Sequence, residues 1–350
     1  MKRIYVLENG TYLRKEGNFL KLIKDKRVID EIPLNNLQHL ILIGYTSLSG
    51  GVLNALMDHR VETVLLAPSG RFKGRICLDE HKHVQRRMAQ YLKLSDKDFV
   101  TKTARSIVSG KLRNQARFLA LRGQRLKKQP ILDVAAAIKI LAKEVKNTND
   151  IELIRGIEGH GSMLYFRVFS HLILNTQFTF HKRTKRPPLD PVNALLSFVY
   201  TLLTNEVLTA IKIVGLDPYL GALHSIEYGR PSLACDLVEQ WRTFLGDRFV
   251  LGLINKRAIT KDDFIYRKIE DLDFVDEVDL KQKRPVEMKP HTMRALLKAY
   301  ETWMQKEIVH IETNKRLSFR NLILYQVRKF EKYLLGEDEE YKTFPWAKYT

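Results

Sequence analysis

The stretch Gly215–Trp241 contains His224, Asp236 and Glu239, whose imidazole and carboxylate groups can bind divalent metals. His224 precedes a turn punctuated by glycine and proline, and Ser232 occupies the position expected of a helix N-cap. Asp236 and Glu239 are three residues apart on the predicted helix that follows, so both carboxylates project from one side of it. Brought together by the turn, these groups could form an oxygen-rich metal site with one imidazole ligand. A solvated helix face beside a packed histidine accounts for the same spacing, and the residues alone leave both interpretations open.

A further carboxylate, Glu158, is surrounded by three glycines within a predicted helix. Gly156, Gly159 and Gly161 each lower helix stability by about 1 kcal/mol relative to alanine. Three of them within six residues therefore need some compensation. The usual one is the close approach of another backbone or of a ligand, which we expect here.

These groups belong to a chain of 350 residues with a large excess of positive charge. Lysine and arginine number 59 against 40 acidic residues, a formal net charge of +19. Such an excess favours a polyanionic partner, because cationic side chains displace condensed counterions from phosphate backbones. An anionic membrane surface would also attract the chain, but no window approaches 18 uninterrupted apolar residues, so we expect no membrane-spanning helix and no membrane partner.

The positive charge is concentrated in two places. Residues 101–130 contain nine lysines or arginines and no acid, and a basic loop covers residues 182–186. Either could contact phosphates or simply face water. The predicted DNA-contacting residues come from these two places and from the turn after His224: Lys111, Arg113, Arg117, Arg183, Arg186 and Arg230.

Hydrophobic periodicity divides the chain into two predicted domains of an α+β protein. Residues 1–85 contain short apolar runs separated by turns and read as a small β-rich domain with one helix. Residues 86–350 show helical periodicity almost throughout, which predicts a larger, all-helical domain. Two cysteines far apart in sequence, with no apolar run long enough for a signal peptide, indicate a reducing cytoplasm.

Several long segments, in the same order, resemble those of a known family, the universal CRISPR adaptation integrase, whose members are the first-numbered Cas proteins. The resemblance runs nearly end to end and no single segment would establish it. The segments are IPLNNLQHLILIG, the K-x-R-N-Q helix at 111–115, LIRGIEG around Glu158, RPPLDPVNALLSFVY, GLDPYLGALH, YGRPSLACDLVEQWR and RNLILYQV.

The resemblance implies a β-rich N-terminal domain that dimerises and a helical catalytic domain that binds metal and DNA. It assigns the metal ligands to Glu158, His224 and Glu239, which would hold Mg²⁺ or Mn²⁺. Asp236 matches a neighbouring acid of the family and is expected to orient a partner more than to touch the metal.

The implied activity is metal-dependent cleavage and joining of DNA, by which new spacers enter a CRISPR array through transesterification in a prokaryotic cytoplasm. The implied partners are double-stranded prespacer and repeat–leader DNA, a second copy of the chain, and a small ferredoxin-like companion protein. Two alternatives stay open. One is a stand-alone metal nuclease acting on branched DNA or RNA; the other is a non-catalytic scaffold in which Asp236 and Glu239 pair with Arg230 or Arg242.

Overall fold

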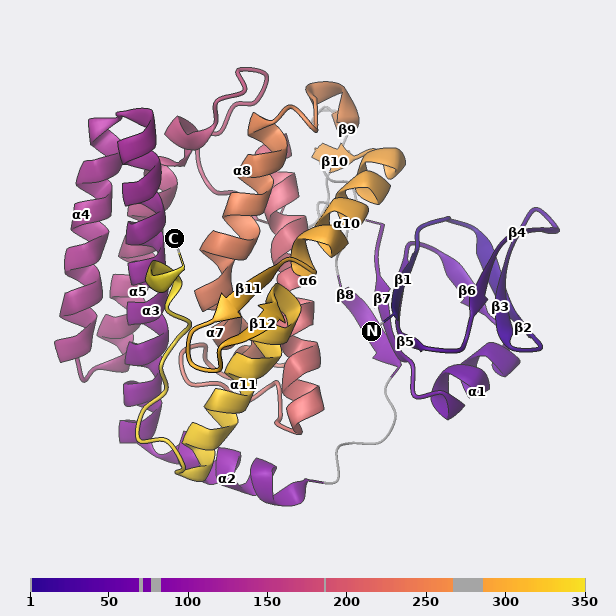
Figure 1. The fold of residues 1–350 in the computed structure, drawn as a ribbon, viewed down its shortest axis with the longest axis horizontal. Helices are drawn as coiled ribbons and strands as arrows, with labels where there is room; N and C mark the ends of the chain where they lie inside the picture. Colours follow the sequence, from indigo (N-terminus) through magenta and orange to yellow (C-terminus); the bar gives the residue numbers. More distant parts are fainter. Residues whose placement is uncertain (1, 69–71, 77–82, 186, 267–285, 350) are drawn as a thin grey trace, which may run out of the picture. The chain divides into compact units, whose positions relative to one another are not determined.

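The chain forms two compact units, Met1–Glu80 and His81–Thr350. The first is β-rich and the second mostly helical (Figure 1), which confirms the predicted α+β class with two domains. The division falls slightly before the boundary expected at residue 85. The structure, a computed structural model, describes residues 2–68, 72–76, 83–185, 187–266 and 286–349.

The N-terminal unit contains two four-stranded sheets, ordered β1-β5-β7-β8 and β4-β3-β2-β6. Strand β5 runs parallel to both β1 and β7, whereas β3 pairs antiparallel with β2 and β4. The elements are β1 (Lys2–Val6), β2 (Thr11–Glu16), β3 (Phe19–Lys24), β4 (Arg27–Pro33), β5 (Leu37–Ile43), β6 (Thr46–Leu48), α1 (Gly50–Asp58), β7 (Glu62–Leu66) and β8 (Phe72–Ile76).

One hydrophobic core joins the sheets and helix α1 of this unit. Leu13 of β2 lies opposite Leu22 of β3, and both are buried together with Leu40 of β5 and Leu56 of α1. Helix α1 begins after Ser49, whose side chain accepts a hydrogen bond from the backbone N–H of Val52. The sequence signal for this helix, apolar residues at helical spacing after a serine, therefore corresponds to a capped and buried element.

The second unit is a bundle of helices in which the 30-residue helix α3 packs against α4, α5 and α7. The helices are α2 (Val84–Ser95), α3 (Lys97–Leu126), α4 (Gln129–Glu144), α5 (Ile151–Arg167), α6 (Pro191–Val214), α7 (Ser232–Trp241), a π-helix (Arg242–Asp247), α8 (Arg248–Asn255), α10 (Pro290–Met304) and α11 (Phe319–Leu335).

Two short antiparallel pairs interrupt the helices, so the expectation of an all-helical domain was too strict. Strand β9 (Phe264–Tyr266) pairs with β10 (Val286–Met288), and β11 (Glu307–His310) pairs with β12 (Lys315–Ser318). Each strand has only three or four residues, too few for alternation to stand out from the surrounding helical pattern.

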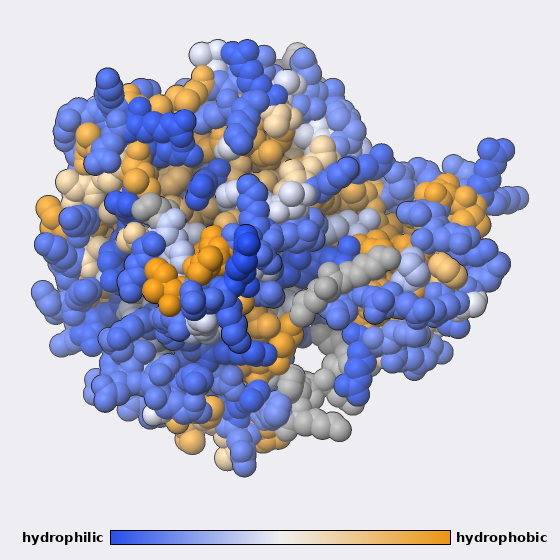
Figure 2. Space-filling view, viewed as in Figure 1, coloured by the Kyte–Doolittle hydropathy of each residue, from blue (hydrophilic) through white to orange (hydrophobic). Residues whose placement is uncertain are grey.

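Helix α6 is the most hydrophobic element of the bundle. It is long and apolar enough to cross a membrane, but 72% of its apolar window is buried inside the protein, as expected of a core helix. The face of the helical unit drawn in Figure 2 is covered mainly by hydrophilic side chains, with hydrophobic ones in scattered groups.

Candidate metal and DNA site

Asp236 on α7 is fully buried and holds the loop that carries His224. Its Oδ2 accepts hydrogen bonds from the backbone N–H groups of Ala222 (2.6 Å) and Leu223 (2.9 Å), and its Oδ1 accepts one from that of His224 (3.0 Å). The same Oδ1 lies 2.7 Å from Nδ1 of the His224 ring. Because a carboxylate can only accept, Nδ1 carries the hydrogen and Nε2 keeps its lone pair for a ligand. Asp236 thus orients the imidazole.

A glycine allows this loop to lie against the start of α7. A Cβ atom on Gly221 would lie 2.5 Å from Oδ2 of Asp236 and 2.8 Å from the carbonyl carbon of Ser232. The N-cap of α7 is Pro231, and Ser232 is the first helical residue, with its hydroxyl donating to the carbonyl of Ser225 (2.9 Å). The predicted cap was therefore misplaced by one residue, because the serine hydroxyl bonds the loop and not the helix.

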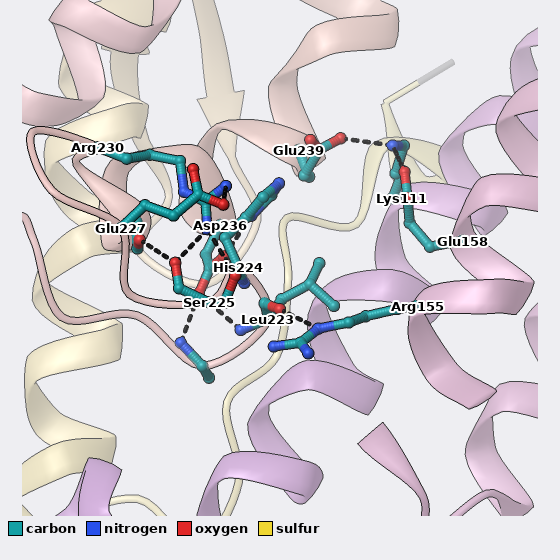
Figure 3. A network of polar contacts seen from close by, with 12 residues as sticks. Lys111, Arg155, Glu158, Leu223, His224, Ser225, Glu227, Arg230, Asp236 and Glu239 are labelled. Atoms are coloured by element: carbon teal, nitrogen blue, oxygen red, sulfur yellow. Dashed lines mark hydrogen bonds and ion pairs between the residues drawn. The ribbon is translucent and has the colours of Figure 1, made fainter. Parts of the chain in front are cut away.

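The two glutamates that were predicted to be ligands are joined by a lysine. The ammonium of Lys111, on α3, lies 2.8 Å from Oε2 of Glu239 and also forms an ion pair with Oε1 of Glu158, on α5. Figure 3 shows this bridge and, beside it, the His224 ring between Asp236 and the carboxylate of Glu239. The bridge brings three separate helices, α3, α5 and α7, to one point.

Glu239 is kept ionised by its neighbours. Burial on its own would raise the pKa of this carboxyl group, but Arg242 and Lys111 outweigh that effect and lower the pKa to about 2. The Arg242 guanidinium lies 3.0 Å from Oε1 of Glu239. Asp236 and Glu239 are 0% and 2% exposed. The interpretation of these acids as a solvated helix face was therefore wrong.

Glu158, His224 and Glu239 line a single cavity of about 640 Å³. No three His, Cys, Asp or Glu side chains among the described residues already stand close enough together to enclose a metal ion. The donor set nevertheless fits a hard divalent cation, with two carboxylates and one imidazole nitrogen. In addition, Oε2 of Glu239 is buried and makes no hydrogen bond of good geometry, although the Lys111 ammonium is close.

The glycines around Glu158 differ in what they allow. A Cβ on Gly161 would lie 2.2 Å from Cδ2 of Leu112, so this glycine lets α5 and α3 pack closely. Gly156 and Gly159 have nothing within 4 Å of such a Cβ, so the expected close approach within the protein is wrong for these two. Gly159 lines the cavity beside Glu158, and its lack of a side chain leaves that part of the cavity open.

An arginine that sequence reasoning missed connects the helix of Glu158 to the loop of His224. Arg155 lies one turn before Glu158 on α5, and its Nε donates a 2.7 Å hydrogen bond to the carbonyl of Leu223, next to His224. Figure 3 shows this contact on the side of the loop that faces α5. The spacing of Arg155 and Glu158 on one helix was visible in the sequence, but the distant carbonyl was not.

Asp247 is a further buried acid on the cavity wall that the sequence did not indicate. Tyr165 donates a 2.9 Å hydrogen bond to its Oδ2, and Tyr200 donates one to its Oδ1. Burial raises the pKa of Asp247 to about 6, although both tyrosines oppose the shift. The π-helix from Arg242 to Asp247 widens the turn here, and both of its end residues line the cavity.

The predicted DNA-contacting residues lie in different surroundings. Lys111 is buried in the ion-pair bridge, whereas Arg183 lines the cavity. Arg113 and Arg117 are on α3 outside the cavity lining, the former exposed. Arg230 pairs with Glu227 at 2.7 Å and not with Asp236 or Glu239. Arg186 lies outside the described residues.

The sequence matches the family model described as CRISPR associated protein Cas1 over residues 4–302. A CRISPR-associated endonuclease Cas1 of Thermus thermophilus is 34% identical over 97% of this chain and 96% of its own length. A Cas1 endonuclease of Chlorobaculum tepidum is 32% identical over 99% of this chain and 98% of its own. One from Rhodospirillum rubrum is 40% identical over 75% of this chain and 79% of its own.

Solved structures share the fold. A Cas1 protein from Thermotoga maritima superposes with a TM-score of 0.79 at 24% identity, covering 98% of this chain and 99% of its own. A casposase bound to its integration product gives 0.80 at 22%, covering 98% and 93%. A chain of a Cas6-RT-Cas1–Cas2 complex gives 0.82 at 20%, covering 98% of this chain and 36% of the other. With relatives above 30% identity along almost its entire length, the chain belongs to the CRISPR-associated Cas1 family.

Proposed function

We propose that this protein is a metal-dependent DNA endonuclease and integrase that inserts new spacers into a CRISPR array by transesterification. The curated relatives are named CRISPR-associated endonucleases, and one structural neighbour was solved with an integration product. The observation that carries the proposal is the convergence of Glu158, His224 and Glu239, from α5, a loop and α7, on one cavity. The family resemblance seen in the sequence implies the same three ligands.

In this proposal Glu158, His224 and Glu239 hold Mg²⁺ or Mn²⁺, and three protein ligands leave positions for water and phosphate oxygens. When bound, the cation supplies charge neutralisation at the scissile phosphate and a more nucleophilic hydroxyl. Asp236 keeps Nε2 of His224 free to bind, and Arg155 holds the His224 loop against the helix of Glu158. Such outer contacts orient ligands and tune their basicity.

The proposed substrates are double-stranded prespacer DNA and the CRISPR repeat with its leader, in a prokaryotic cytoplasm. The net charge of +19 supports a DNA partner. We further propose a homodimer formed through the β-rich unit and a ferredoxin-like companion. A structural neighbour solved as a complex of Cas1 with Cas2 supports the companion.

An integration assay on a repeat-containing plasmid, with and without the companion, tests this function. Wild-type protein should join prespacer 3′ ends to the repeat only with Mg²⁺ or Mn²⁺. Glu158→Ala should lose at least 100-fold of this activity, since it removes a ligand. Glu144→Ala, at the exposed end of α4, is the matched control and should retain it.

The alternatives give different results in the same assay. Cleavage of branched substrates without 3′-end joining would indicate a stand-alone nuclease. DNA binding unaffected by a chelator, with no cleavage or joining, would indicate a scaffold. Full activity in Glu158→Ala would remove Glu158 from the site.

A further inference from the structure

The cavity wall next to the predicted metal ligands contains two arginines against one tyrosine ring. The Cζ atoms of Arg183 and Arg242 lie 5.5 and 5.0 Å from the centroid of Tyr200. The hydroxyl of Tyr200 is anchored on Asp247, so the ring is a fixed support for both guanidinium groups. Two cations are thus held in one wall.

Arg183 is rigidly positioned by neutral groups. Its guanidinium donates to Oδ1 of Asn193 (2.8 Å), to the hydroxyl of Ser197 (3.0 Å) and to the carbonyl of Thr184. None of the carboxylates in the described part of the chain lies within ion-pair distance of it. Its Nε is buried and has no hydrogen-bond partner. A partly buried, oriented cation without a carboxylate partner is expected where an anion binds.

Two neighbouring cations add to the positive charge of Arg183 on this wall. Lys185 also lines the cavity, and burial together with the nearby Arg242 and Arg183 lowers the pKa of its ammonium. The Nε of Arg242 is buried without a partner, although another nitrogen of the group pairs with Glu239. Repulsion among these three groups would be relieved by a bound anion.

The acids of the cavity cancel only part of this charge, because among the residues that the structure describes its lining contains six lysines and arginines against three acids. Glu158 and Glu239 are both engaged by Lys111, and Asp247 accepts from two tyrosines. The contact of 3.0 Å between Arg242 and Glu239 places the surplus directly beside the predicted metal ligands. A DNA strand whose scissile phosphate lay at those ligands would bring its neighbouring phosphate to this wall.

We propose that Arg183, Lys185 and Arg242 form a phosphate subsite that binds the internal phosphodiester group next to the bond at Glu158, His224 and Glu239. This proposal rests on DNA being the substrate, as proposed above. Arginine suits the role because its planar group offers several donors in a fixed geometry to phosphate oxygens. The subsite would set the register of the strand without reading its bases.

The first test measures DNA binding without divalent metal as a function of salt. Arg183→Gln should weaken binding of a branched duplex roughly tenfold, the effect of losing a charged hydrogen bond. It should also lower the slope of log K against log salt by about 1. Lys139→Gln, an exposed lysine on α4, should change neither quantity. An unchanged slope in Arg183→Gln would overturn the subsite.

The second test identifies the phosphate. One neutral methylphosphonate is moved along the strand of a substrate that has 5′-hydroxyl ends. At the contacted position the neutral linkage should weaken binding by the wild type, and it should weaken binding by Arg183→Gln less, because that variant has already lost one of the three cations at this phosphate. If the loss of affinity from the methylphosphonate and the loss from Arg183→Gln add up wherever the methylphosphonate is placed, Arg183 acts only through folding. A dependence on a 5′-terminal phosphate would point to an end-binding pocket and overturn the internal subsite.

Two further variants separate folding and catalysis from this contact. Arg183→Lys keeps the charge and should restore most of the salt slope; if it resembles Arg183→Gln, the charge is not what matters. Glu158→Ala should lose cleavage but bind DNA at least as tightly as the wild type, because it removes a carboxylate from the cavity and one partner from Lys111. Retained cleavage by that variant would refute the proposed metal ligand while leaving the binding result for Arg183 intact.

Discussion

The ammonium of Lys111 lies 2.8 Å from Oε2 of Glu239, and the same group pairs with Glu158. It therefore stands between the two carboxylates that the family resemblance assigns to a metal. Burial on its own would lower the pKa of this ammonium, but the two glutamates outweigh it and raise the pKa. The lysine is charged and competes with any other cation for the same oxygens.

Lys111→Met should therefore bind Mn²⁺ more tightly than the wild type, by roughly tenfold or more. The substitution removes one cation from both carboxylates. Without metal, and within the described ranges of the chain, Glu158 then has no ion pair and the buried Glu239 keeps only Arg242, so we expect a loss of stability below the roughly 3–5 kcal/mol of a fully broken buried pair. Titration calorimetry gives the affinity, and melting with and without Mn²⁺ should show a larger metal-induced gain in the variant. Lys139→Met is the control. Equal or weaker Mn²⁺ affinity in Lys111→Met would contradict competition.

Asp236→Asn should weaken metal binding by about 10- to 100-fold, the usual loss when a residue that orients a metal ligand is altered. The asparagine keeps only one acceptor. Its amide nitrogen faces either the N–H groups of Ala222 and Leu223, which loosens the loop, or Nδ1 of His224, which removes the acceptor that fixes the tautomer of the ring. Glu227→Gln, at an exposed acid of the same loop, is the matched control. Titration with Mn²⁺ measures the affinity of both variants. If Asp236→Asn and Glu227→Gln bind Mn²⁺ equally well, Asp236 supports the fold only.

Asp247 predicts an unusual pH dependence of stability. Its pKa is raised from 3.8 to about 6 in the folded state, so the folded protein holds a proton that the unfolded chain releases. Stability from this group is therefore greatest at low pH and falls as pH rises from about 4 to 6, by roughly 3 kcal/mol in total. Asp247→Asn should abolish this fall.

Denaturant unfolding of the wild type and Asp247→Asn from pH 4 to 7 checks the sign. The unfolding free energy of Asp247→Asn minus that of the wild type should increase as the pH rises. Asp133→Asn, on α4 and away from the cavity, should track the wild type. Parallel curves for Asp247→Asn and the wild type would show that Asp247 titrates normally.

Local patterns were enough to predict the elements but not all of their surroundings. Helix α10, Pro290–Met304, agrees with the helical periodicity predicted across residues 86–350, because one face of it packs on the bundle. By contrast, Lys111 belongs to a run of cations and was predicted to face DNA, yet it is buried. The nearest acids that pair with it, Glu158 and Glu239, are distant in sequence, so no local pattern could reveal the bridge.

The candidate site was predicted partly from residue spacing and partly from the family resemblance. Spacing brought Asp236 and Glu239 to one helix, and the structure shows why they differ: one binds the loop and the other faces the cavity. The glycines drew attention to Glu158, but its role as a metal ligand came from the family resemblance alone. Asp247 had no signal, because its place on the wall depends on a π-helix that ordinary helical periodicity does not foresee.

Arg155 provides a test of whether α5 and the His224 loop must be held together. Its hydrogen bond to the carbonyl of Leu223 is a direct connection between the element of Glu158 and that of His224. Arg155→Met should weaken Mn²⁺ binding by roughly tenfold, because chelation requires both ligands at once. The loss of one hydrogen bond from a charged donor should lower stability by only about 1.5–3 kcal/mol.

The readout that separates alignment from stability is the dependence on metal concentration. A misaligned pair should need more Mn²⁺ for half-maximal cleavage, with activity largely restored at saturation. Arg125→Met, at an exposed arginine of α3, should leave the metal requirement unchanged. If Arg155→Met instead lost activity at every metal concentration while its melting temperature fell, the arginine would be supporting the fold, and the two ligands would be aligned by helix packing alone.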